Sequence, residues 1–96
     1  MKSIKIMNNC FKDLRNITKA DFYLCDESGN ILVQAGDRIT IKVDEIVKFI
    51  ESDANSQEIA GLNLFKVIGA EVRYCLIVNA RGGDGHMYGR IAVSEI

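Results

Sequence analysis

The sequence predicts a small α+β domain in which helices flank one antiparallel sheet of four or five strands. Two pairs of short strand-like runs are each joined by a turn signal, and helical apolar spacing precedes, separates and follows these pairs. Hairpins form antiparallel pairs, so this α-β-β-α-β-β-α order excludes a doubly wound parallel sheet. The remaining arrangement is a single sheet with helices packed against it.

The first half of the chain contains a helix, a hairpin and a second helix. Apolar residues recur at helical spacing over roughly residues 3–17, and an aromatic-rich strand follows at residues 21–26. A Gly-Asn turn then leads into a second strand, Ile31 to Ala35. A second helix begins near Val43, and the polar stretch Glu51 to Glu58 is predicted to be a solvated loop.

The second half repeats the hairpin and ends in a helix. Strands are predicted at residues 62–68 and 72–80, and the continuous apolar centre of the second indicates an interior strand beside residues 21–26. After the glycine-rich turn Arg81 to Gly85, Asp84 can cap a last helix. The buried stripe of this helix is predicted to comprise Met87, Tyr88, Ile91, Ala92 and Ile96.

Length and composition indicate one globular domain over residues 1–96. Hydrophobic residues make up 48% and charged residues 26%, which excludes a disordered chain. The net charge of −1 makes non-specific binding to nucleic acid or membranes improbable for the chain as a whole. Since no apolar run reaches membrane-helix length and the first residues show no apolar core of a signal peptide, we expect a cytoplasmic protein.

Charge is unevenly distributed along the chain. Residues 1–20 hold five cations against Asp13 alone, whereas residues 21–60 are rich in acids. We interpret the basic segment as a solvated helix face, with a docking or dimer surface as the alternative.

The chain lacks the motifs of metal centres and enzymes. Cys10, Cys25 and Cys75 are far apart in sequence and are expected to be reduced, buried thiols. The single histidine, His86, has only Asp84 nearby as a candidate catalytic partner, and we expect it on the surface of the last helix. We therefore expect neither an enzyme nor a bound metal or cofactor.

Three small sensor folds share the predicted order of elements: the PAS, GAF and roadblock-like (profilin-like) folds. Within such a sheet, Lys66 and Arg73 would lie among apolar neighbours on their strands. A cation in that position either extends to water at the rim or recognises an anion.

Several short motifs resemble the amino-terminal sensor domain of carbohydrate (sugar) diacid regulators, a family of bacterial transcription factors. The resemblance covers nearly the whole chain in order. The motifs are residues 25–30, 49–52, 56–61, 64–67, 73–79 and 87–92. The resemblance implies a module that, in the full protein, precedes a helix-turn-helix DNA-binding domain. The last helix reaches Ile96 without a stop signal, so we expect an N-terminal fragment of a longer regulator.

The resemblance implies that the domain senses a small anionic metabolite such as a sugar diacid. An anion would need converging cationic and amide donors. The candidate ligand-binding residues are Lys66, Arg73, Asn79, Gln57 and Ser52.

We also expect a homodimer built mainly from the first and last helices, since regulators of twofold DNA sites are usually dimeric. Gly89 and Ala92 on the last helix, with Met7, Cys10 and Phe11 on the first, could provide the dimer face. The alternative function is a roadblock-like protein-interaction or dimerisation module that has no small-molecule ligand.

Overall fold

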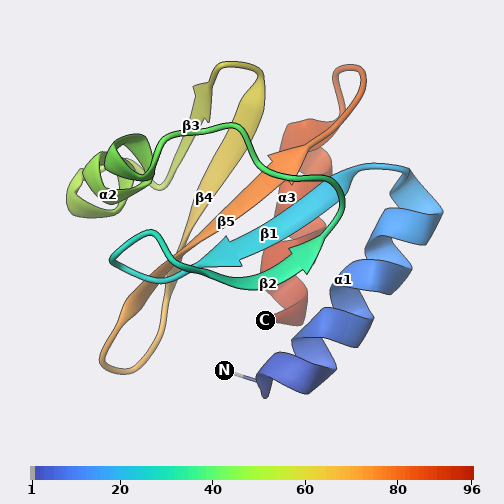
Figure 1. Cartoon of the computed structure of the whole chain (residues 1–96), viewed down its shortest axis with the longest axis horizontal. Helices are drawn as coiled ribbons and strands as arrows, with labels where there is room; N and C mark the ends of the chain where they lie inside the picture. Colours follow the sequence, from blue (N-terminus) through green and yellow to red (C-terminus); the bar gives the residue numbers. More distant parts are fainter. Residues whose placement is uncertain (1) are drawn as a thin grey trace.

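The computed structural model describes residues 2–96 and contains one antiparallel sheet with three helices (Figure 1). The elements in chain order are α1 (Ile4–Thr18), β1 (Asp21–Cys25), β2 (Ile31–Ala35), α2 (Val43–Glu51), β3 (Ser56–Ile59), β4 (Leu62–Ile68), β5 (Arg73–Asn79) and α3 (Gly85–Glu95). The strand order across the sheet is β2-β1-β5-β4-β3. The predicted α+β class and antiparallel sheet are confirmed.

Strand β5 is the centre of the sheet, as its apolar sequence predicts. It pairs with β1 on one side and with β4 on the other, so that Leu76 lies opposite both Leu24 and Phe65. The four residues 75–78 are fully buried because helices cover both faces of the sheet.

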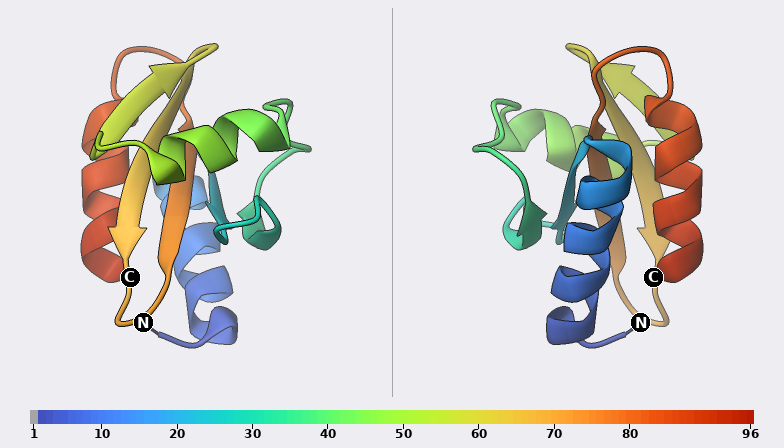
Figure 2. Two further views of the ribbon diagram at one scale, coloured as in Figure 1. Left: turned by 90° about the vertical axis from the view of Figure 1, so that its left-hand side faces the viewer. Right: turned by 90° about the vertical axis from the view of Figure 1, so that its right-hand side faces the viewer.

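The alternation of side chains along each strand divides the core between the two faces. Helix α2 covers one face, and α3 lies on the other (Figure 2). The α2 face contains Tyr23, Cys25, Ile46, Phe49, Ile50, Leu62, Leu64, Cys75 and Ile77. Helices α1 and α3 share the second cluster, which includes Met7, Phe11, Phe22, Leu24, Phe65, Val67, Leu76, Val78 and Ala92.

Strand β3 corrects the prediction of a solvated loop at Glu51–Glu58. Its residues Ser56–Ile59 pair in register with Leu62–Phe65 of β4. The two strands are joined by the two-residue turn Ala60–Gly61, in which both residues have positive φ, as a tight hairpin requires. An edge strand exposes much of its surface, so a polar sequence can form it without burying apolar side chains.

Helix α3 begins where the sequence predicts, directly after Asp84, although the Asp84 side chain makes no capping hydrogen bond. Its buried stripe differs from the prediction: Met87 and Ile91 are exposed, while Gly85, Gly89 and Ala92 face the sheet. The small residues allow the helix axis to approach the strands closely, and this turns the larger side chains outward.

None of the helices within residues 2–96 has the length and apolar character needed to cross a membrane.

Candidate functional site

The two predicted ligand-binding cations, Lys66 and Arg73, lie together at the C-terminal end of α2. The ammonium group of Lys66 donates a hydrogen bond to the carbonyl of Ser52 and lies 5.5 Å from the centre of the Phe49 ring. Arg73 Nη1 donates to the carbonyl of Ile50 at 3.0 Å. These carbonyls belong to the end of a helix, where backbone acceptors lack helical partners and carry partial negative charge. Both cations therefore stabilise the position of α2.

Arg73 also contacts the loop after β1. Its Nη2 lies 3.8 Å from Glu27 Oε2, and Glu27 Oε1 accepts a hydrogen bond from the Arg73 backbone N–H at 2.8 Å. The guanidinium thus joins a carboxylate and a helix terminus of the same chain. A ligand carboxylate at this place would compete with Glu27 and with the α2 carbonyls.

The remaining predicted residues do not complete one pocket. Ser52 lies beside Lys66, but Gln57 is exposed on β3 and lines a separate hollow with Glu45 and Lys48. Asn79 is the last residue of β5, paired with Asp21, while Arg73 is the first. At ~3.3 Å per residue, the two ends of this strand are about 20 Å apart. The structure brings together Ser52, Lys66 and Arg73, and it leaves Gln57 and Asn79 elsewhere.

The residues expected to form a helical dimer face are used within the chain itself. Met7, Phe11 and Ala92 are buried in the cluster beneath α1 and α3, and Gly89 lies against the Phe65 ring. Cys10 is half-buried and packs against the same cluster. The buried side chains of Met7, Phe11 and Ala92 cannot contact a second copy unless the domain opens.

The outer edge of β3 is the open edge of the sheet. Strand β3 pairs only with β4, and the Lys66 N–H donates to the Asn55 carbonyl at 2.9 Å. Backbone groups alternate in direction along an antiparallel strand. The N–H and C=O groups of Gln57 therefore point towards β4, as the Asn55 carbonyl does, whereas those of Ser56 and Glu58 point outward. The side chains of Ser56, Gln57 and Glu58 are exposed.

The opposite edge of the sheet, formed by β2, is better protected. Helix α1 packs along β2, and the ladder between β1 and β2 contains an irregularity between Leu24 and Cys25. Bulges and covering helices are two common ways in which proteins block pairing at a sheet edge. Strand β3 was not predicted because the Ala60–Gly61 turn is its only mark in the sequence.

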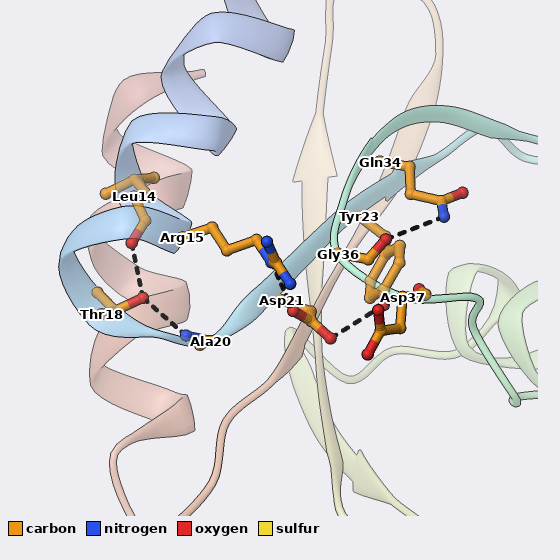
Figure 3. Close-up of polar contacts among 9 residues, drawn as sticks. All are labelled: Leu14, Arg15, Thr18, Ala20, Asp21, Tyr23, Gln34, Gly36 and Asp37. Atoms are coloured by element: carbon orange, nitrogen blue, oxygen red, sulfur yellow. Dashed lines mark hydrogen bonds and ion pairs between the residues drawn. The ribbon is translucent and has the colours of Figure 1, made fainter.

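A polar cluster ties the start of β1 to the segment after β2 (Figure 3). The Tyr23 hydroxyl donates to the Asp37 carbonyl and lies 3.5 Å from Asp21 Oδ2. Burial, reinforced by the nearby carboxylates Asp21 and Asp37, raises the pKa of Tyr23 to about 12.

Burial also raises the pKa of the two thiols beneath α2. The pKa of Cys25 rises to about 12, with a smaller contribution from Asp26, and the pKa of Cys75 is raised in the same direction. Unionised thiols of this kind are poor nucleophiles, so the α2 face offers no reactive cysteine. Among the described residues, no group of His, Cys, Asp or Glu is arranged to hold a metal ion.

Comparison with known proteins shows the fold and leaves the family open. No family model matches the chain, and no curated protein matches it. A solved structure, Myxococcus xanthus MglB, is 18% identical and superposes with a TM-score of 0.65 over 99% of this chain and 87% of that one. Among the three predicted folds this likeness fits the roadblock-like one and gives no support to PAS or GAF, so the chain has a roadblock-like fold.

Proposed function

We propose that this chain is a protein-interaction module that forms a homodimer by pairing the β3 edges of two copies. The observation that carries the proposal is the outward-facing backbone of Ser56 and Glu58 on an edge strand that, within residues 2–96, pairs only with β4. Unpaired strand edges readily accept another strand. Likeness to MglB supports the fold on which this edge depends.

Self-association accounts for the geometry better than metabolite sensing does. The cations chosen for a sugar diacid hold α2 in place, and the two amide side chains lie away from them. The residues of the first and last helices that we expected to form the dimer, among them Met7, Phe11, Gly89 and Ala92, pack into their own core, although Ile17, Met87 and Ile91 on these helices stay exposed. Resemblance to diacid regulators stays a prediction that no comparison tests.

Glu58→Pro tests the proposal because the only backbone group it removes is an outward N–H. Proline is tolerated at edge positions whose N–H does not bond within the sheet, so the β3–β4 hairpin should survive. Light scattering should give twice the 10.7 kDa protomer mass for the wild type and a monomer for Glu58→Pro. Glu58→Thr is the matched control, since it removes the same charge but keeps the N–H, and it should remain dimeric.

A second variant distinguishes loss of the dimer from a folding defect. Ser56→Lys with Glu58→Lys leaves the backbone intact and places like charges opposite one another across a paired edge, which opposes association. Circular dichroism should show native secondary structure for all variants. A monomeric wild type, or a dimer that survives both edge variants, would contradict the proposal.

A further inference from the structure

Two adjoining surface hollows meet at the C-terminal half of α1. One, of about 220 Å³, is lined by Arg15, Asn16, Lys19, Asp21 and Arg81. The other, of about 330 Å³, shares Arg15 and Asn16 with it and extends to Lys12 and to the end of β2. We call the cations Lys12, Arg15, Lys19 and Arg81 the basic corner. The fold brings Arg81 of the glycine-rich loop beside a helix more than sixty residues earlier in the chain.

The charge of the basic corner contrasts with that of the whole chain. Its hollows contain four cations and a single carboxylate, Asp21, although the chain has a net charge of −1. Asp21 is already bound, because its Oδ1 accepts a hydrogen bond from Arg15 Nε at 2.9 Å (Figure 3). Lys12, Lys19 and Arg81 are exposed and form no ion pair among residues 2–96.

The loop beside the basic corner leaves its backbone accessible. Gly82 has φ +108°, and no atom lies within 4 Å of where a side chain on Gly82 or Gly83 would begin. An extended segment can therefore approach the backbone beside Arg81. The ion pair with Asp21 fixes Arg15 at the centre of the two hollows, and the other cations surround it.

We propose that the basic corner binds an acidic segment of a partner protein. Opposite charge recruits such a segment over about a Debye length, and each carboxylate can form charge-assisted hydrogen bonds. Nucleic acid fits less well because the lining residues include no aromatic side chain on which a base could stack. The inference extends the proposed interaction function to a second surface, at the edge of the sheet opposite β3.

Peptide binding measured by fluorescence anisotropy tests this surface. The probe is a labelled twelve-residue peptide of alternating Glu and Ser, compared with the same peptide carrying Lys in place of Glu and with a twelve-nucleotide single-stranded RNA. The wild type should bind the Glu peptide, reject the Lys peptide and bind the RNA more weakly. Raising the salt concentration from 50 to 500 mM should weaken binding by about tenfold, because exposed charges are screened.

Charge reversal locates the binding site. Lys12→Glu with Arg81→Glu changes one residue from each contributing segment and should weaken binding by at least ~10-fold, since two attractions become repulsions. The matched control, Lys5→Glu with Lys42→Glu, makes the same change in net charge at exposed positions away from the corner and should stay within about twofold of wild type.

Several outcomes would overturn the inference: no binding of the Glu peptide, equal loss in the control variant, or tighter binding of the RNA. A change of oligomeric mass in the corner variant would identify a second copy as the occupant and would also overturn it. The Glu58→Pro protein should bind the Glu peptide as the wild type does. Failure of the dimer and failure of the basic corner are therefore separate results.

Discussion

The ring of Phe65 on β4 occupies the space that a side chain on Gly89 of α3 would need. A Cβ at position 89 would overlap ring atoms of Phe65, well inside van der Waals distance. Phe65 is 5% exposed and belongs to the cluster shared by α1 and α3. The absence of a side chain at Gly89 thus sets how closely α3 approaches the sheet.

Gly89→Ala should destabilise the domain by about 1–2 kcal/mol. Alanine improves helix propensity by about 1 kcal/mol, but the overlap with Phe65 forces a shift of helix or ring that costs more, as overpacking usually does. Urea unfolding measures the difference. Gly83→Ala is the control, since open space surrounds that position and its backbone has no positive φ. Phe65→Leu should recover part of the loss in the double variant, and full stability of Gly89→Ala would contradict the packing argument.

Gly89 and β3 show where prediction from the sequence ends. Periodic apolar residues predicted most elements closely, because burial on one face leaves a repeat in the sequence. A glycine that packs against an aromatic ring of another element leaves no such repeat. Large residues such as Met87 therefore predicted the wrong buried face for α3. Strand β3 depends on pairing with β4, so its own residues carry little signal.

The candidate site was predictable in part for a similar reason. Lys66 and Arg73 lie on the α2 face of the sheet, and strand alternation makes this face predictable because the period of two is a property of the backbone. Their contacts with the end of α2 depend on how that helix crosses the sheet, which the sequence does not specify. The separation of Asn79 from Arg73 could be read from the sequence, because the predicted strand 72–80 already places the two residues near its opposite ends.

Arg73→Ala should lower stability by about 1 kcal/mol, because it removes the hydrogen bond to Ile50 and the ion pair with Glu27. Hydrogen bonds from charged donors contribute more than this when buried, but the Arg73 side chain is 43% exposed and is screened by water. Thermal unfolding measures the change. Arg38→Ala is the control, since Arg38 is exposed and forms no ion pair within the described residues.

Calorimetry with glucarate and galactarate should give no binding heat for the wild-type protein. Both cations of the predicted site already bind acceptors within the chain, and the amide side chains do not face them. Glycerate serves as a smaller anion in the same measurement. Micromolar binding that is lost in Arg73→Ala would support the sensor function and contradict this expectation.

Stability should fall in alkaline solution, between about pH 9 and pH 12. The pKa of Tyr23 is raised from 10.0 to about 12 in the folded protein, so above pH 10 the unfolded chain loses this proton first and is favoured. Cys25 acts in the same direction, since its pKa is raised from 9.0 to about 12. Urea midpoints measured across this range should decline more gently for Tyr23→Phe. Tyr88→Phe, on the partly buried face of α3, is the control and should keep the wild-type slope.

Thiol labelling should distinguish Cys10 from the pair beneath α2. Cys25 and Cys75 are register partners on β1 and β5, and both are fully buried. Only the thiolate reacts, and burial raises the pKa of both groups.

With a disulfide reagent at pH 8, one thiol per chain should react quickly, and this phase should vanish in Cys10→Ser. The other two should react together, at the rate at which α2 leaves the sheet. Arg73→Ala should accelerate the slow phase alone, because Arg73 holds the end of α2. Rapid reaction of all three thiols in the native wild type would show that α2 does not protect this face.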